Sequence, residues 1–285
     1  DIMFTLSAFA DEISMDLTTQ MEVLDKYSIK HIEMRGVNGK NLSDCTLAEA
    51  KEIKSQMDAR GFSLSAVGSP IGKIGICDEF GPHLDQFKRV VEIAQMMETK
   101  FIRMFSFFIP KGEDPENYAD EVLERWNRFI DAAKGSGLTL LHENEKGIYG
   151  DTAARCLNLL KSLNCPDVRA TFDPANFVQC GVQPYPDAYE LLAPYIAYMH
   201  IKDALFADGN VTPAGEGDGQ VPQILAELKK AGYDGFLSLE PHLVDFEGFA
   251  ALEQECDESK PDKSKGALLF GVAADALNGI LLELD

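Results

Sequence analysis

The chain is poor in positive charge and contains no long uninterrupted apolar run. Its 285 residues include 26 Lys and Arg against 47 Asp and Glu, which gives a formal net charge of −21. A field of this sign repels phosphate backbones, so we expect no nucleic-acid partner. The longest apolar stretch, 266–284, is interrupted by Asp275 and Asn278 and repeats its apolar residues at helical spacing. We therefore predict no membrane span.

Cysteine motifs and targeting signals are also missing. The six cysteines form no CxxC pair, and in a chain of this size that pattern is typical of reduced thiols in the cytosol. Near the N-terminus, Asp11 and Glu12 come too early for the apolar region of a secretory leader. These observations favour a cytoplasmic protein.

Short apolar runs alternate along the chain with longer segments of helical periodicity. The runs lie at 4–9, 30–34, 62–67, 101–105, 138–142, 168–172, 196–201 and 235–239. Runs that are apolar on both faces fit parallel strands that are covered by helices, and their spacing is close to that of βα units of roughly 30 residues. The pattern predicts an α/β protein, a (β/α)8 TIM barrel, in which residues 1–285 form a single domain with a closing helix at about 266–284.

A doubly wound open sheet is the alternative fold. It is disfavoured because no GxGxxG motif follows the first apolar run. The polar, proline-containing segment 253–265 is expected to be a surface loop before the closing helix, and no linker divides the chain.

Four successive strand ends carry residues that can bind a metal ion. Catalytic residues of such barrels lie at the C-terminal ends of the strands, where the last four runs place Glu143, Asp173, His200 and Glu240. Three carboxylates and one imidazole suit a divalent ion such as Mn²⁺, Mg²⁺ or Co²⁺, and without a cation the carboxylates would repel one another. The alternative interpretation is that acidic residues at strand ends only cap the following helices.

These strand ends, together with the barrel pattern, resemble the xylose isomerase-like superfamily of sugar phosphate isomerases and epimerases. The motifs that carry the resemblance are HEN at 142–144, FDPAN at 172–176, HIKD at 200–203 and SLEPH at 238–242. The resemblance implies that Glu143, Asp173, His200 and Glu240 hold one divalent metal ion, with Mn²⁺ as first choice and Mg²⁺, Co²⁺ or Zn²⁺ as alternatives. It also implies that Glu143 and Glu240 are the catalytic acid/base pair and that the partner is a small sugar or sugar phosphate. A homo-oligomer is left open.

The chemistry of the four residues agrees with this assignment. Removal of a proton next to a carbonyl builds charge on the carbonyl oxygen, and a metal ion stabilises the resulting enediolate. Carboxylates on both sides of the substrate can take a proton from one face and return one to the other. We therefore expect a metal-dependent isomerase or epimerase. Two alternatives stay open: a dehydratase of an inosose-like or dehydroshikimate-like substrate on the same site, and a non-catalytic sugar-binding module.

Two residues beside the expected ligands are candidates for substrate binding. Lys202 lies two residues after His200 and so shares its face of the strand. It is expected either to hold a substrate phosphate or enediolate oxygen or to form a salt bridge with a neighbouring carboxylate. Asn176 stands where sugar epimerases of the superfamily often carry His, and its amide is a candidate partner for a substrate hydroxyl.

Four further polar residues near the strand ends have weaker assignments. Lys73 lies in a glycine-containing loop after the third run and is a candidate for anion binding. Glu33 closes the second run, and we expect it either to contact substrate or to pair with Arg35 or Lys73. Arg103 is expected to pair with a buried acid, and His142 to point toward the helices in a structural role.

Overall fold

A closed barrel of parallel strands forms the centre of the molecule. The computed structural model describes residues 4–243 and 255–285. Within them, eight parallel strands close in the order β1-β12-β9-β8-β7-β6-β5-β2. These strands are β1 (Thr5–Ala8), β2 (His31–Met34), β5 (Ser63–Gly68), β6 (Phe101–Met104), β7 (Thr139–Glu143), β8 (Val168–Phe172), β9 (Ile196–Ile201) and β12 (Phe236–Leu239). The predicted TIM barrel is confirmed, with each strand within one residue of its expected position.

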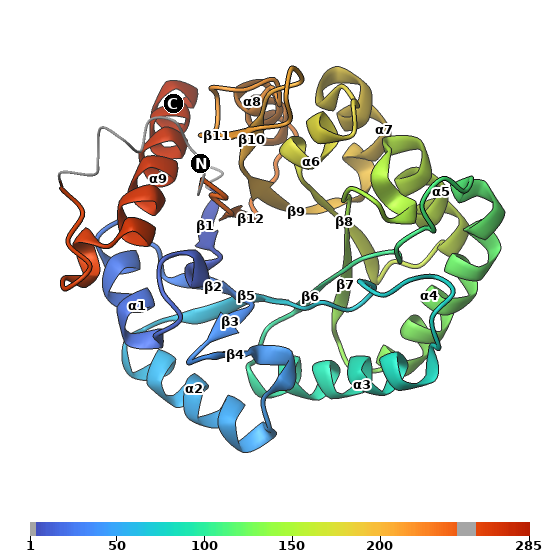
Figure 1. Cartoon of the computed structure of the whole chain (residues 1–285), viewed down its shortest axis with the longest axis horizontal. Helices are drawn as coiled ribbons and strands as arrows, with labels where there is room; N and C mark the ends of the chain where they lie inside the picture. Colours follow the sequence, from blue (N-terminus) through green and yellow to red (C-terminus); the bar gives the residue numbers. More distant parts are fainter. Residues whose placement is uncertain (1–3, 244–254) are drawn as a thin grey trace.

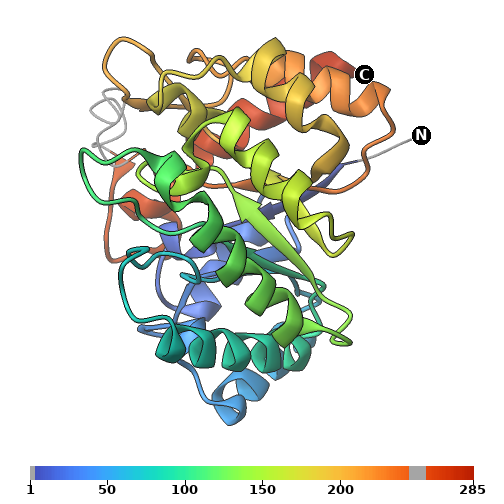
Figure 2. The same ribbon diagram turned by 90° about the vertical axis from the view of Figure 1, so that its right-hand side faces the viewer.

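Helices cover the outside of this barrel (Figure 1). They are α1 (Leu17–Asp25), α2 (Leu47–Ala59), α3 (Gly81–Met96), α4 (Ala119–Ala133), α5 (Ala153–Leu163), α6 (Pro174–Gln179), α7 (Tyr189–Leu192), α8 (Val221–Lys230) and α9 (Lys265–Leu284). Figure 2, turned by 90°, shows the green helices α4 and α5 lying over the strands on the side that faces the viewer. Among them α2, α3 and α5 contact β5, β6 and β8 directly, and strands packed against helices in this way are apolar toward them.

The barrel interior is polar just below its C-terminal end. Side chains alternate between the two faces of a strand, so Tyr198 and His200 of β9 both point inward. The hydroxyl of Ser65 lies 2.6 Å from that of Ser7 and 2.8 Å from that of Tyr198. This buried layer of hydroxyl groups lies in the barrel interior, below the residues of the strand ends.

Helix α9 closes the barrel and is the most apolar element. By length and composition alone it could cross a membrane. In the structure its apolar side is packed: Phe270 is fully buried and meets Tyr27 edge-on at 5.5 Å. This packing accounts for the apolar composition of the closing helix, which begins one residue before its expected position.

Two short antiparallel hairpins beyond the strand ends were not expected from the sequence. They pair β3 (Gly36–Val37) with β4 (Lys40–Asn41) and β10 (Asp203–Ala204) with β11 (Val211–Thr212). In the polar segment before α9, residues 253–254 lie outside the described residues, and a short 3₁₀ turn at Pro261–Lys263 interrupts the expected loop.

Buried Asp203 holds the loop that follows β9. Its carboxylate accepts hydrogen bonds from four backbone N–H groups, at 2.7–3.2 Å, of Ala204, Gly215, Gly217 and Gly219. A Cβ atom at Gly217 or Gly219 would come within 2.4 or 2.6 Å of Asp203 Oδ1. The glycines of this segment therefore allow the backbone to approach the carboxylate closely.

Candidate metal centre

The structure brings the four predicted metal ligands together at the C-terminal end of the barrel. Glu143, Asp173, His200 and Glu240 each offer a ligand atom, and these atoms all lie within 4.8 Å of one another. They come from β7, β8, β9 and β12, which are consecutive in the barrel, and all four are buried. The alternation of side chains along each strand turns all four inward.

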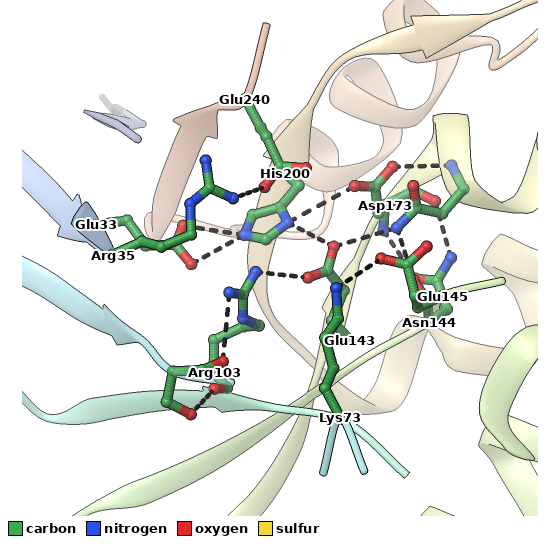
Figure 3. A network of polar contacts seen from close by, with 12 residues as sticks. Glu33, Arg35, Lys73, Arg103, Glu143, Asn144, Glu145, Asp173, His200 and Glu240 are labelled. Atoms are coloured by element: carbon green, nitrogen blue, oxygen red, sulfur yellow. Dashed lines mark hydrogen bonds and ion pairs between the residues drawn. The ribbon is translucent and has the colours of Figure 1, made fainter. Parts of the chain in front are cut away.

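His200 lies between two sets of carboxylates (Figure 3). Its Nδ1 is 2.8 Å from Glu143 Oε2 and 3.6 Å from Asp173 Oδ2. Its Nε2 is 2.9 and 3.1 Å from the two carboxylate oxygens of Glu33. Burial alone would lower the pKa of His200, but Glu143 and Glu33 raise it well above its ordinary value. Nδ1 is the ring nitrogen that faces the candidate ligands Glu143 and Asp173.

Glu33 is the acceptor behind His200 that the sequence did not identify. It is fully buried, and its partner is His200 rather than Arg35 or Lys73, so that expected pairing is wrong. The reason lies in the barrel geometry: β2 and β9 face each other across the interior, and sequence spacing does not reveal such a contact. The expected contact of Glu33 with substrate stays a prediction.

The two oxygens of Asp173 have different partners. Oδ1 accepts a hydrogen bond at 3.0 Å from the backbone N–H of Asn176 and so caps the N-terminus of α6. Oδ2 accepts one at 2.6 Å from Lys202 Nζ. The helix-cap interpretation thus applies to one oxygen of this residue, while the other faces the candidate ligands.

Lys202 joins two of the candidate ligands. Its Nζ donates to Asp173 Oδ2 and to Glu240 Oε1, each at 2.6 Å, and its side chain is only 3% exposed. Burial alone would lower the pKa of Lys202, but Asp173 and Glu240 raise it well above its ordinary value. The structure thus shows the expected salt bridge to neighbouring carboxylates, and the substrate role of Lys202 stays a prediction.

Arg103 and Asn176 hold Glu143. Arg103 donates from Nη1 to Glu143 Oε1 at 2.9 Å, which confirms its expected pairing with a buried acid. The amide of Asn176 donates to Glu143 Oε2 at 3.2 Å and to the carbonyl of Asn144 at 2.9 Å. Burial alone would raise the pKa of Glu143, but the charges of His200 and Arg103 lower it to about 2. Glu143 is therefore a fixed, ionised carboxylate in this structure.

Lys73 lies further out than the other candidates. Its ammonium is 3.6 Å from Glu145 and lies over the ring of Phe105 at 4.4 Å, with 38% of the side chain exposed. It does not touch the four candidate ligands. Its expected role in anion binding stays a prediction.

His142, by contrast, points outward. Its Nε2 lies 2.8 Å from Ser106 Oγ, and its ring meets Trp126 edge-on. This is the structural position expected for it.

The sequence did not predict that Arg35 lies beside Glu240. Arg35 Nη1 lies 3.6 Å from Glu240 Oε2, and its guanidinium is held by Asp11 at 2.8 and 3.0 Å. His242 Nε2 lies 3.5 Å from Glu240 Oε1. The sequence contained part of this information: Arg35 is two residues after Glu33, so its side chain is expected on the same inward face of the strand.

The donor set fits a divalent cation. Oxygen and imidazole ligands bind such ions at about 2.0–2.3 Å, so two donors on one ion lie at most about twice that distance apart. The four candidate ligand atoms, which all lie within 4.8 Å of one another, are close to this arrangement. Three carboxylates with one imidazole are ligands typical of hard or borderline divalent metals. Glu33 also supplies the hydrogen-bond acceptor that metal-bound histidines usually have at their other ring nitrogen.

A family model described as "Xylose isomerase-like TIM barrel" matches residues 22–260. The chain belongs to this family. The match covers most of the sequence and includes all four candidate ligands, which confirms the resemblance seen in the strand-end motifs.

Individual relatives are distant. The uncharacterized Methanocaldococcus jannaschii protein MJ1311 is 24% identical over 158 residues, which is 53% of this chain and 53% of the relative. The chain thus spans about half the length of the curated relative it matches.

Solved structures agree over nearly the whole chain. IolI with a bound zinc atom has a TM-score of 0.78 at 15% identity, with 99% of both chains covered. A D-tagatose 3-epimerase-like protein has a TM-score of 0.73 at 18% identity, with 99% of this chain and 100% of the other covered. At these identities the likeness shows the shared fold of this xylose isomerase-like chain.

Proposed function

We propose that this protein is a divalent-metal-dependent isomerase or epimerase that moves a proton next to the carbonyl of a small sugar or sugar phosphate. The observation that carries the proposal is the convergence of Glu143, Asp173, His200 and Glu240 within 4.8 Å. The zinc atom bound by IolI and the likeness to the D-tagatose 3-epimerase-like protein support it. Mn²⁺ is the proposed ion, because it accepts both oxygen and imidazole ligands.

Glu143 and Glu240 are the proposed acid/base pair. They come from β7 and β12, on either side of the two strands that carry Asp173 and His200, so a substrate at the centre has a carboxylate on each side. A bound divalent ion supplies Lewis-acid stabilisation of charge on the substrate carbonyl oxygen. The carboxylates then remove a proton from one face of the carbon and return one to the other.

The surrounding residues keep both carboxylates ionised and oriented. Arg103 donates a hydrogen bond to Glu143, and the pKa of Glu143 lies at about 2. Burial alone would raise the pKa of Glu240, but Lys202 leads the positive charges that lower it well below its ordinary value. Both groups are therefore ionised at neutral pH, so either can accept a proton, and the one that returns a proton to the substrate must first take it up from solvent. Lys202, Asn176, Lys73 and Glu33 remain the proposed substrate-binding residues.

The first test measures metal content and then proton exchange. Protein is incubated with Mn²⁺, excess metal is removed, and metal per chain is measured by elemental analysis for wild type, Glu143→Gln and Glu240→Gln. The loaded proteins are then incubated with a panel of ketoses and ketose phosphates in D₂O. We expect about one ion per wild-type chain, deuterium incorporation next to the carbonyl, and loss of exchange in both variants. The exposed Glu216 provides the control variant Glu216→Gln, which should behave as wild type.

Each other result points to a different function. A product that absorbs in the ultraviolet, formed without an epimer, would assign the site to a dehydratase. A metal-loaded, folded protein that binds a ketose but exchanges no deuterium would favour the sugar-binding module. Absence of bound metal in a folded wild type would refute the proposed chemistry.

A further inference from the structure

The ammonium group of Lys202 lies where a positive charge is needed among the candidate ligands. It is 2.6 Å from Asp173 Oδ2 and 2.6 Å from Glu240 Oε1, and these residues are two of the four proposed to hold the ion. A divalent ion that takes these oxygens at about 2.0–2.3 Å would face the ammonium across the same atoms. The ion and the ammonium group of Lys202 would then repel each other strongly, because buried surroundings screen charges poorly.

Lys202 also compensates buried negative charge when no ion is bound. Three buried carboxylates within a few ångströms repel one another unless a cation or a proton neutralises them. His200 reaches Glu143 at 2.8 Å, and Arg103 reaches the other oxygen of Glu143 at 2.9 Å. Asp173 and Glu240 have their closest cationic contact in Lys202. Removal of this ammonium would leave two buried carboxylates poorly compensated.

We propose that Lys202 is the built-in counter-cation of the centre, which a divalent metal ion displaces from Asp173 and Glu240 when it binds. The inference rests on the proposed metal dependence. Lys202 then has two effects in opposite directions: it stabilises the metal-free fold, and it weakens metal affinity because its ion pairs must be broken. Lys202 is thus a positioning residue whose contacts set how tightly the metal is held.

The test compares Lys202→Met with a matched lysine variant. Lys54→Met removes the same charge from helix α2 on the outside of the barrel, where Lys54 pairs with Asp58 at 3.0 Å and with Glu98 at 3.3 Å rather than with a candidate ligand. Each protein is stripped with a chelator and dialysed. The midpoint of thermal unfolding is measured for the metal-free form, and the Mn²⁺ dissociation constant is measured by titration calorimetry.

We expect Lys202→Met to lower the thermal unfolding midpoint of the metal-free protein by about 5–10 °C, because it removes the shared partner of two buried carboxylates. We expect it to bind Mn²⁺ at least about tenfold more tightly than wild type, because no ion pair has to be broken. Lys54→Met should stay close to wild type in both measurements. If Lys202→Met does not fold without metal, Lys202→Gln, which keeps a hydrogen-bond donor but no charge, should show the same two changes at smaller size.

The outcomes separate this inference from the proposed function. Wild-type and Lys202→Met proteins that bind Mn²⁺ equally tightly would overturn the inference and leave the metal site intact. Binding that appears only in Lys202→Met would overturn the displacement, because Lys202 would then keep the ion out of the wild-type centre, and would count against a metal-dependent wild type. Failure of every protein to bind Mn²⁺ would overturn both.

Discussion

The contact between Glu33 and His200 leads to a prediction about metal affinity. In the structure both oxygens of Glu33 lie within 3.1 Å of His200 Nε2, and both side chains are fully buried. With a metal ion on Nδ1, the remaining ring proton must sit on Nε2, and Glu33 is the group that accepts it. Glu33→Leu should therefore remove both the hydrogen bond and the charge that orient the ring.

The size of the effect follows from these contacts. Loss of the acceptor behind a metal-bound histidine typically weakens metal binding about 10–100-fold, and we expect this range for Glu33→Leu. Glu33→Gln keeps an oxygen that can accept the Nε2 proton but loses the charge. A hydrogen bond to a charged group is stronger by about 1 kcal/mol than one between neutral groups, so we expect about fivefold weaker binding for Glu33→Gln.

The assay is titration of chelator-stripped protein with Mn²⁺, with circular dichroism to confirm that each variant is folded. Glu145→Gln is the matched control, because Glu145 is another carboxylate near Glu143 but pairs with Lys73 instead of His200. It should change the dissociation constant less than about threefold. A folded Glu33→Leu protein that binds Mn²⁺ as tightly as wild type would refute the role assigned to Glu33.

Three further predictions concern the fold around the centre. Asp203→Ala leaves four N–H groups, two of them buried, without their acceptor and should cost about 3–5 kcal/mol, measured by urea unfolding; an unchanged midpoint would contradict this. Gly72→Ala places a Cβ 2.0 Å from the carbonyl oxygen of Phe105 at φ +89° and should cost about 4 kcal/mol or more, whereas Gly39→Ala, at φ +81° in open space, should cost about 1 kcal/mol. Burial raises the pKa of Glu12 from 4.5 to about 8, so the folded protein binds an extra proton between these pH values and loses stability as the pH rises through them. Glu12→Gln should flatten that decline in metal-free protein, and equal urea midpoints for both proteins at pH 5 and at pH 9 would argue against it.

The barrel and its four inward residues could be predicted because both depend on local order in the chain. Alternation of apolar runs with helical segments indicates βα units wherever it occurs. The ends of parallel strands meet at one end of a barrel, so Glu143, Asp173, His200 and Glu240 could be placed together without knowledge of any contact. The motifs around them then pointed to the family, which the match over residues 22–260 confirmed.

The partners of these residues were decided by tertiary structure. Glu33 meets His200 across the barrel at a separation of 167 residues, and the choice between His200, Arg35 and Lys73 depends on which strands face each other. In the same way Lys202 could be assigned a salt bridge, but the sequence could not show that it joins Asp173 to Glu240. Alternation along a strand determines which way a side chain points. The distances across the closed barrel, which no sequence spacing records, determine what that side chain meets.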